Sequence, residues 1–179
     1  MTKKFGIFGG AFDPVHEGHL QAARLAQREL TLDKIYFVPF NQAVHKAQPR
    51  YSAVERVELL RRALQSYAYM DICLAEIERG GASYAVDTLE YLKKQPDFTD
   101  ADLYYIIGTD AFEKIFSWKE PVKLLTLTRF IVIFRPGYDF ARIEQMFAGQ
   151  EKFLDQIYLI EDAGRDISST RIREQTFGF

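Results

Sequence analysis

Short apolar runs alternate with amphipathic segments along the whole chain. The runs are apolar at consecutive positions, which is typical of strands buried on both faces. They lie at residues 5–8, 35–38, 70–75, 103–107, 130–134 and 157–160. Between the first two runs, Leu20, Ala23, Ala26 and Leu30 recur at three- and four-residue spacing and predict a helix over residues 19–30.

Helix-starting signals mark the other amphipathic segments. Ser52 followed by Glu55 forms a capping-box pattern, and Ser83 is a predicted cap for the helix after the third run. Further helices are expected over residues 111–127, in two pieces around Pro121, over residues 141–147 and from about Ser169.

Strands and helices in alternation predict one α/β domain over residues 1–179, a doubly wound parallel sheet with helices on both faces. Sheets of this kind bind ligands beyond the carboxyl ends of their strands, where the strand order reverses. The residues that follow the first, fourth and fifth strands are therefore the first candidates for chemistry.

Composition and charge narrow the functional classes. With 23 Lys and Arg against 25 Asp and Glu, the chain has no basic excess for binding nucleic acid. Its one cysteine excludes an internal disulfide framework and a multi-cysteine zinc site. No run approaches the ~20 apolar residues of a membrane span, so no membrane partner and a cytoplasmic location are expected.

The first loop has the composition of a phosphate site. Gly9 and Gly10 end the first strand, and their backbone can approach an anion closely. His16 and His19 stand at a helix start, where free N–H groups and the helix dipole favour phosphate. The alternative is that the glycines form a tight turn and the histidines cap the helix. The spacing of a dinucleotide-binding fingerprint is absent, and two histidines without a third ligand do not favour zinc.

A second anion site is predicted near the end of the chain. Ser168, Ser169 and Thr170 can cap a helix and present backbone N–H groups, and Arg173 lies one turn further on. An ordinary capped helix with solvated arginines explains the same residues equally well.

The two end motifs together resemble those of a nucleotidyltransferase superfamily. His16 to His19 resembles its (H/T)xGH motif, and residues 167–173 resemble ISSTxxR. Residues 76–89 are similar to the ExxRxGxSYTxDTL stretch of bacterial nicotinate-mononucleotide adenylyltransferases, and residues 106–110 with Trp118 are similar to their IIGxD…W segment. The resemblance implies a Rossmann-like fold that transfers adenylyl from ATP to nicotinate mononucleotide, giving deamido-NAD and pyrophosphate in NAD biosynthesis.

The resemblance also implies roles for individual residues. It places catalytic groups at His16, His19 and Arg173. It assigns ATP binding to Gly9, Gly10, Ala11, Phe12, Lys46, Gly108, Asp110, Ser169 and Thr170. It assigns the acceptor nucleotide to Ser83, Tyr84, Thr88, Trp118 and Arg135. Mg²⁺ is expected to arrive with ATP, held by phosphate oxygens and water more than by protein ligands.

Three departures from the family pattern affect these expectations. Ala11 stands where relatives have Thr or Ser, so only its backbone is expected to serve phosphate. Ala43 and Val44 replace a Pro-Pro pair, which predicts a looser loop before His45 and Lys46. The end at Phe179 predicts a shortened C-terminal part.

Two other functions share the end motifs. A phosphopantetheine adenylyltransferase is disfavoured by residues 83–89 and by the Trp118 segment, and a nucleotide sensor without turnover is disfavoured by His16, His19 and Arg173. The sequence leaves open the preference for nicotinate over nicotinamide nucleotide, whether Asp110 meets ribose or metal, and whether the protein is a homo-oligomer.

Overall fold

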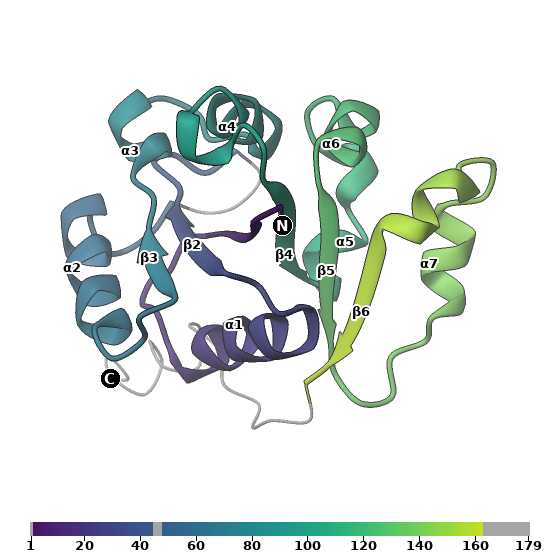
Figure 1. Cartoon of the computed structure of the whole chain (residues 1–179), viewed down its shortest axis with the longest axis horizontal. Helices are drawn as coiled ribbons and strands as arrows, with labels where there is room; N and C mark the ends of the chain where they lie inside the picture. The colour runs from purple at the N-terminus through teal and green to yellow at the C-terminus, as the bar shows by residue number, and fades with distance from the viewer. Residues whose placement is uncertain (1, 45–47, 163–179) are drawn as a thin grey trace.

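The computed structural model describes residues 2–44 and 48–162, which form a six-stranded parallel sheet with helices on both faces (Figure 1). Its strands are β1 (Lys4–Gly10), β2 (Lys34–Pro39), β3 (Met70–Ile72), β4 (Asp102–Gly108), β5 (Arg129–Phe134) and β6 (Ile157–Glu161). Its α-helices are α1 (Glu17–Leu30), α2 (Ala53–Leu64), α3 (Ala75–Arg79), α4 (Ala85–Lys93), α5 (Thr109–Phe112), α6 (Pro121–Leu127) and α7 (Ala141–Met146). Short 3₁₀ helices cover Pro96–Phe98, Ile115–Ser117 and Glu151–Gln156.

The strand order is β3-β2-β1-β4-β5-β6, and every neighbouring pair is parallel. The chain first builds outward from β1 to β3, then crosses back and builds in the other direction from β4. This is the doubly wound arrangement, and its order reverses between β1 and β4. The predicted fold class is confirmed, and the reversal defines where a ligand is expected.

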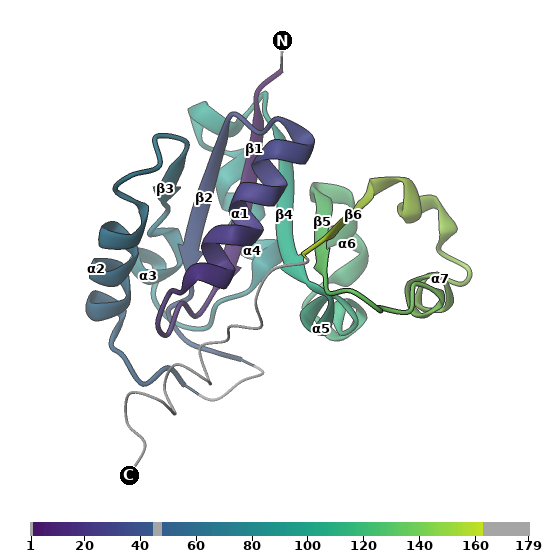
Figure 2. The same cartoon turned by 90° about the horizontal axis from the view of Figure 1, so that it is seen from below.

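Each face of the sheet has its own apolar core because side chains alternate along each strand. On β4, Tyr104 and Ile106 pack with α1 and α2, whereas Leu103, Tyr105 and Ile107 pack with α4 and α6. In Figure 2, α1 crosses one side of the strands, and α4 and α6 lie behind them.

The predicted capping box of α2 is confirmed. The Ser52 N–H donates to the Glu55 carboxylate at 2.8 Å, and the Glu55 N–H donates to the Ser52 hydroxyl at 3.3 Å. These bonds satisfy backbone donors that the first helical turn leaves free. They fix the start of the helix that carries the buried Arg56.

Two sequence expectations were wrong in detail. The run at residues 70–75 is a strand only to Ile72, and Ala75 already begins α3. Ser83 does not cap α4: Tyr84 is the N-cap residue, and the Ser83 hydroxyl instead accepts from the Asn41 N–H at 2.9 Å. The Ser83 hydroxyl thus binds a backbone group distant in the sequence instead of the N–H groups of the helix that follows it. The helix expected from Ser169 lies outside the described residues.

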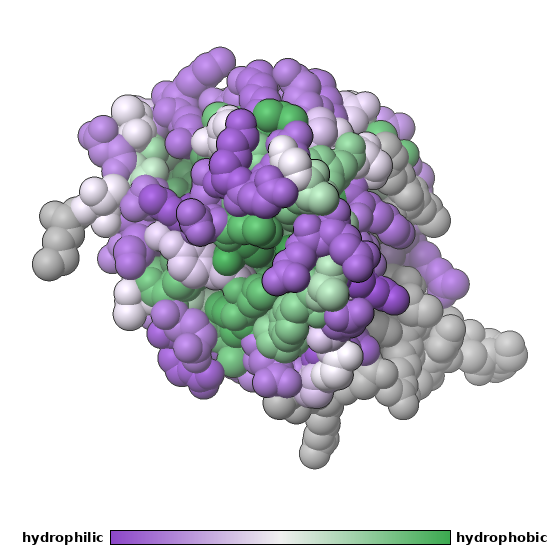
Figure 3. All heavy atoms as spheres, turned by 90° about the vertical axis from the view of Figure 1, so that its right-hand side faces the viewer, coloured by the Kyte–Doolittle hydropathy of each residue, from purple (hydrophilic) through white to green (hydrophobic). Residues whose placement is uncertain are grey.

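The sheet ends at β6 on the side shown in Figure 3, where an apolar area lies among mainly hydrophilic side chains. Leu159, a residue of this edge strand, is 42% exposed. In residues 2–44 and 48–162 no helix combines the length and apolar character that a membrane crossing needs.

Candidate active site

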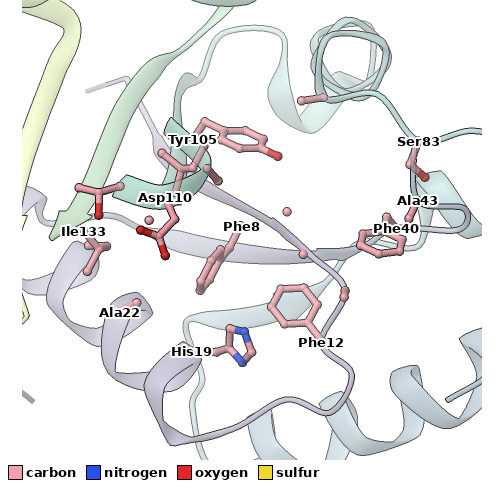
Figure 4. A pocket seen from close by; sticks show the side chains of 18 of the residues that line it. Phe8, Phe12, His19, Ala22, Phe40, Ala43, Ser83, Tyr105, Asp110 and Ile133 are labelled. Carbon is pink, nitrogen blue, oxygen red and sulfur yellow. The ribbon is translucent and has the colours of Figure 1, made fainter. Parts of the chain in front are cut away.

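A cavity of about 1180 Å³ opens at the carboxyl ends of β1 and β4. Its wall includes residues from the first loop, from the start of α4, from the end of β4 and from the loop after β5. Figure 4 shows His19 next to Phe12 on one side, Asp110 pointing inward from α5 just after β4, and Ser83 beside Phe40 on another side. The cavity exceeds the range of about 300–1,000 Å³ typical of small-ligand sites, so it has room for two nucleotides.

Gly9, near the end of β1, leaves room for the Tyr105 side chain of the neighbouring strand β4. A Cβ at Gly9 would overlap the buried Tyr105 hydroxyl, and a Cβ at Gly10 would lie 3.0 Å from the Phe12 ring. Both glycines line the cavity. The absence of side chains therefore lets backbone, rather than a methyl group, face a ligand here.

Replacing Gly9 with alanine is expected to lower the free energy of unfolding by about 1–3 kcal/mol, because the new methyl must displace Tyr105 from a packed site. Gly108→Ala is the matched control: Gly108 has an ordinary φ of −82°, and a Cβ there meets nothing within 4 Å. Urea denaturation of both variants measures the difference. Equal stability losses would show that Tyr105 yields without cost.

Phe12 turns the loop sharply after the glycines. Its φ is +48°, a left-handed conformation that non-glycine residues rarely adopt, and its side chain is 1% exposed. The ring packs against Phe8 and Phe37 at 5.6 and 5.3 Å between centroids. This packing holds the loop in the strained conformation, which is common at ligand sites.

His16 and His19 lie together at the start of α1. His16 is the N-cap residue, and the two rings stack with centroids 3.7 Å apart. The His16 N–H donates to Nδ1 of His19 at 3.2 Å. Because Nδ1 is an acceptor, the proton of a neutral His19 is on Nε2. The capping alternative is therefore partly correct, and it also fixes the tautomer.

Burial keeps both histidines neutral. Desolvation, with a smaller contribution from the charge of His16, lowers the pKa of His19 to about 3, and desolvation also lowers the pKa of His16. In the described part of the chain, Nδ1 of His16 is buried without a hydrogen-bond partner. The pair thus offers neutral donor groups to the cavity across the physiological pH range.

A second group of residues lines the cavity around the start of α4. Ser83, Tyr84, Trp118 and Arg135 are among the lining residues, and the Trp118 ring lies edge-on to Tyr105 at 6.2 Å. Lys119 also lines the cavity. The four predicted acceptor residues, which exclude Lys119, thus come together at the cavity from three separate parts of the chain.

Thr88 does not line the cavity. Its side chain is 1% exposed, and its hydroxyl donates to the Glu76 carboxylate at 2.6 Å and accepts from Arg79 at 3.3 Å. Glu76 does line the cavity. Thr88 therefore lies behind the site, where it can orient Glu76.

Several residues at the site were not found from the sequence. Asp13 is 5% exposed, and its carboxylate accepts from the Arg50 and Tyr51 N–H groups at 3.0 and 2.9 Å. Arg56 is buried beside the first loop, and Glu76, Tyr105 and Lys119 line the cavity. For the charged residues among them, the one available signal was a charge next to an apolar stretch. The same pattern occurs on solvated helix faces, so it does not single these residues out.

The cavity lining includes Gly9, Gly10, Ala11, Phe12, Gly108 and Asp110. Lys46, Ser169, Thr170 and Arg173 lie outside the described residues. Among the residues that the structure places, no group of three or more His, Cys, Asp or Glu side chains is arranged to hold a metal ion.

Comparison with known proteins gives a consistent result. A model of the family described as cytidylyltransferase-like matches residues 7–175. A protein of Desulfitobacterium hafniense named probable nicotinate-nucleotide adenylyltransferase is 39% identical, over 97% of this chain and 84% of the relative. A protein of Gloeobacter violaceus with the same name is 38% identical, over 98% and 84%. The solved structure of Plasmodium falciparum nicotinic acid mononucleotide adenylyltransferase with NaAD has a TM-score of 0.73 at 22% identity, over 96% of this chain and 83% of that one.

Proposed function

The chain belongs to the cytidylyltransferase-like family and, within it, to the nicotinate-nucleotide adenylyltransferases, and we propose how its cavity performs their reaction. It is a nucleotidyltransferase that transfers adenylyl from ATP to nicotinate mononucleotide and releases pyrophosphate. The observation that carries the mechanism is the stacked His16–His19 pair beyond the carboxyl end of β1. The pair lines the same cavity as the start of α4.

The reaction is an in-line displacement at the α-phosphorus of ATP. An oxygen of the acceptor's phosphate forms the new P–O bond, and the bond to the pyrophosphate oxygen breaks. The attacking phosphate is already an anion, so no general base is required. Positioning and stabilisation of negative charge then supply the catalysis.

His19 is proposed to donate Nε2–H to the α-phosphate, where charge changes during transfer. Its Nδ1 is held by the His16 N–H, so the donor side is fixed before substrate binds. A neutral imidazole makes this hydrogen bond without transferring its proton. His16, stacked 3.7 Å away, is proposed to serve the neighbouring phosphate oxygens.

Backbone groups of the first loop are proposed to hold the rest of the triphosphate. Gly9 and Gly10 at the end of β1, with Ala11 and Phe12 after them, line the cavity, and so does Gly108 at the end of β4. We assign Asp110 to the nucleotide side, since its carboxylate points into the cavity (Figure 4). The roles of Lys46, Ser169, Thr170 and Arg173 at the outer phosphates stay predictions from the sequence.

Mg²⁺ is proposed to enter with ATP. The described residues offer no group of three metal ligands, whereas Asp110 is a cavity carboxylate that could take a place beside phosphate oxygens and water. When bound, the ion would neutralise negative charge on the phosphates.

The acceptor is proposed to bind at the start of α4. Trp118 can stack on the pyridine ring, and the free N–H groups after Tyr84 can take the nicotinate carboxylate. Arg135 is proposed for the acceptor's phosphate, and Ser83 for hydrogen bonding near the carboxylate. Thr88 is proposed to act indirectly, by orienting Glu76.

One assay tests this function against its rivals. Pyrophosphate release is measured with ATP and, in turn, nicotinate mononucleotide, nicotinamide mononucleotide and phosphopantetheine. The expected result is turnover that is fastest with the nicotinate acceptor. Faster turnover with phosphopantetheine would contradict the proposal, and ATP binding without turnover on any acceptor would favour a sensor. A cytoplasmic location and a homo-oligomer stay predictions.

Lys119 is expected to strengthen the preference for the acid acceptor. Its Nζ lies 2.8 Å from Asp87 and 4.8 Å from the centre of the Tyr84 ring, beside the proposed carboxylate site. Lys119→Met should lower the ratio of kcat/KM for nicotinate over nicotinamide nucleotide about threefold to fivefold, as for a half-exposed ion pair.

The matched control is Lys123→Met. Lys123 forms an equivalent ion pair with Glu90 at 2.6 Å but does not line the cavity, so the ratio should stay as in the parent. If Lys119→Met also left the ratio unchanged, the cation would not face the acceptor's carboxylate.

A further inference from the structure

Arg56 is a buried charged side chain that the mechanism above does not use. It lies in α2 and is 1% exposed. Nη1 donates to the Ala11 carbonyl at 2.7 Å, and Nη2 donates to the Phe40 carbonyl at 2.8 Å. Its guanidinium also lies over the Phe40 ring, 5.4 Å from the ring centre. The side chain therefore joins two loops that are far apart in the sequence.

Both carbonyls belong to residues that line the cavity. Ala11 follows β1 and Phe40 follows β2. A buried guanidinium carries a desolvation cost, and a well-packed apolar side chain often stabilises a fold as well or better. The geometry that only arginine provides is a rigid fork that can hold two carbonyls at once. This argues for a role in positioning rather than in packing alone.

The first bond determines where an N–H group points. In a trans peptide the carbonyl and the next N–H point in opposite directions. The Ala11–Phe12 peptide is trans, so binding of the Ala11 carbonyl to Arg56 directs the Phe12 N–H away from Arg56. Among the hydrogen bonds of the described residues, none uses the Phe12 N–H. It is a free donor in the loop proposed to hold phosphate.

The second bond acts on the acceptor side in the same way. Arg56 holds the Phe40 carbonyl, and on the opposite side of that peptide the Asn41 N–H donates to the Ser83 hydroxyl at 2.9 Å. The Phe40 N–H in turn donates to the Gly10 carbonyl at 3.0 Å. Figure 4 shows Phe40 and Ser83 side by side at the cavity. The two loops and Ser83 are thus connected through one side chain.

We propose that Arg56 is a positioning residue that sets both halves of the active site together, aiming the Phe12 N–H at the ATP phosphates and fixing Ser83 for the acceptor. This inference rests on the function proposed above. It adds that the ATP loop and the acceptor site share a mechanical link, so one substitution should disturb both substrates.

The test compares Arg56→Met and Arg56→Lys with Arg62→Met in the full chain. Arg62 lies on the same helix, but its side chain is 71% exposed and pairs only with Glu58 among the described residues. KM for ATP, KM for nicotinate mononucleotide and kcat are measured by pyrophosphate release, and calorimetry gives the Kd for ATP alone. Thermal melting shows that each variant is folded at the assay temperature.

Arg56→Met is expected to lower kcat/KM about 10- to 100-fold for each substrate, since small misplacements of positioning groups cost this much. Lysine can bond only one of the two carbonyls, so Arg56→Lys should recover part of the loss. Arg62→Met should behave as the parent. Ser83→Ala should raise only the acceptor's KM, which separates a local defect from a shared one.

The outcomes separate the inference from the function. Lack of turnover in both the parent and Arg62→Met would contradict the proposed function, and the ATP Kd of Arg56→Met would then still test the link to the phosphate loop. Kinetic constants and Kd equal to those of Arg62→Met would overturn the inference, as would a loss of stability alone. Failure of both Arg56 variants to fold would also overturn it, because Arg56 would then serve the fold rather than the site.

Discussion

Replacing His19 with alanine should lower kcat about 100-fold or more while the chain stays folded. Loss of one preorganised donor to developing charge costs roughly 3 kcal/mol in the transition state. His19 has the geometry of such a donor, because Nδ1 is occupied by the His16 N–H and Nε2–H is left for substrate. The measurement is kcat for pyrophosphate release at saturating ATP and nicotinate mononucleotide.

Two controls separate this role from packing. His19→Asn keeps an amide N–H near the same place and should retain more activity than His19→Ala. Near-ultraviolet circular dichroism checks that the aromatic packing of Phe8 and Phe12 around position 19 survives. A folded His19→Ala variant with the kcat of the parent would show that the transferred phosphate lies elsewhere in the cavity.

The sheet could be predicted because its determinants are local. Each strand is a run of apolar residues buried on both faces, and the alternation with helices leaves few topologies. The Ser52–Glu55 capping box is equally local, and it formed as predicted. Gly9 and Gly10 end β1, and the two histidines follow within nine residues, so the fold class already placed them at the carboxyl end of the sheet.

The supporting residues could not be predicted because their partners are distant in the sequence. Arg56 contacts the Ala11 carbonyl 45 positions away, and Ser83 receives the Asn41 N–H across 42 positions. Thr88 matched a family motif, yet its hydroxyl turns toward Glu76 behind the cavity. No periodicity distinguishes such side chains from solvated ones. The contacts of these supporting residues are known only from the three-dimensional structure, which brings the loops after β1 and β2 together.

Acid should destabilise this protein partly through His19. Burial, with a smaller contribution from the charge of His16, lowers the pKa of His19 to about 3, whereas in the unfolded chain the ring titrates near 6.5. Between these values the unfolded state binds a proton that the folded state does not, so the free energy of unfolding falls as pH falls below 6.5. One proton contributes at most about 1.4 kcal/mol per pH unit, and the effect sums to about 2 kcal/mol from pH 7.5 to 5.

The comparison that isolates this contribution is urea denaturation of the parent and His19→Gln at several pH values from 7.5 to 5. Carboxylates titrate in both proteins, so their effect cancels in the difference. The parent should lose about 2 kcal/mol more than the variant over this range. His16→Gln should also lose less unfolding free energy than the parent over this range, but by a smaller margin than His19→Gln. The reason is that desolvation also lowers the pKa of His16. If the free energy of unfolding changed with pH equally in the parent and His19→Gln, His19 would take up its proton in the folded protein as readily as in the unfolded chain. His19 would then be charged, and not a neutral donor, during turnover at acid pH.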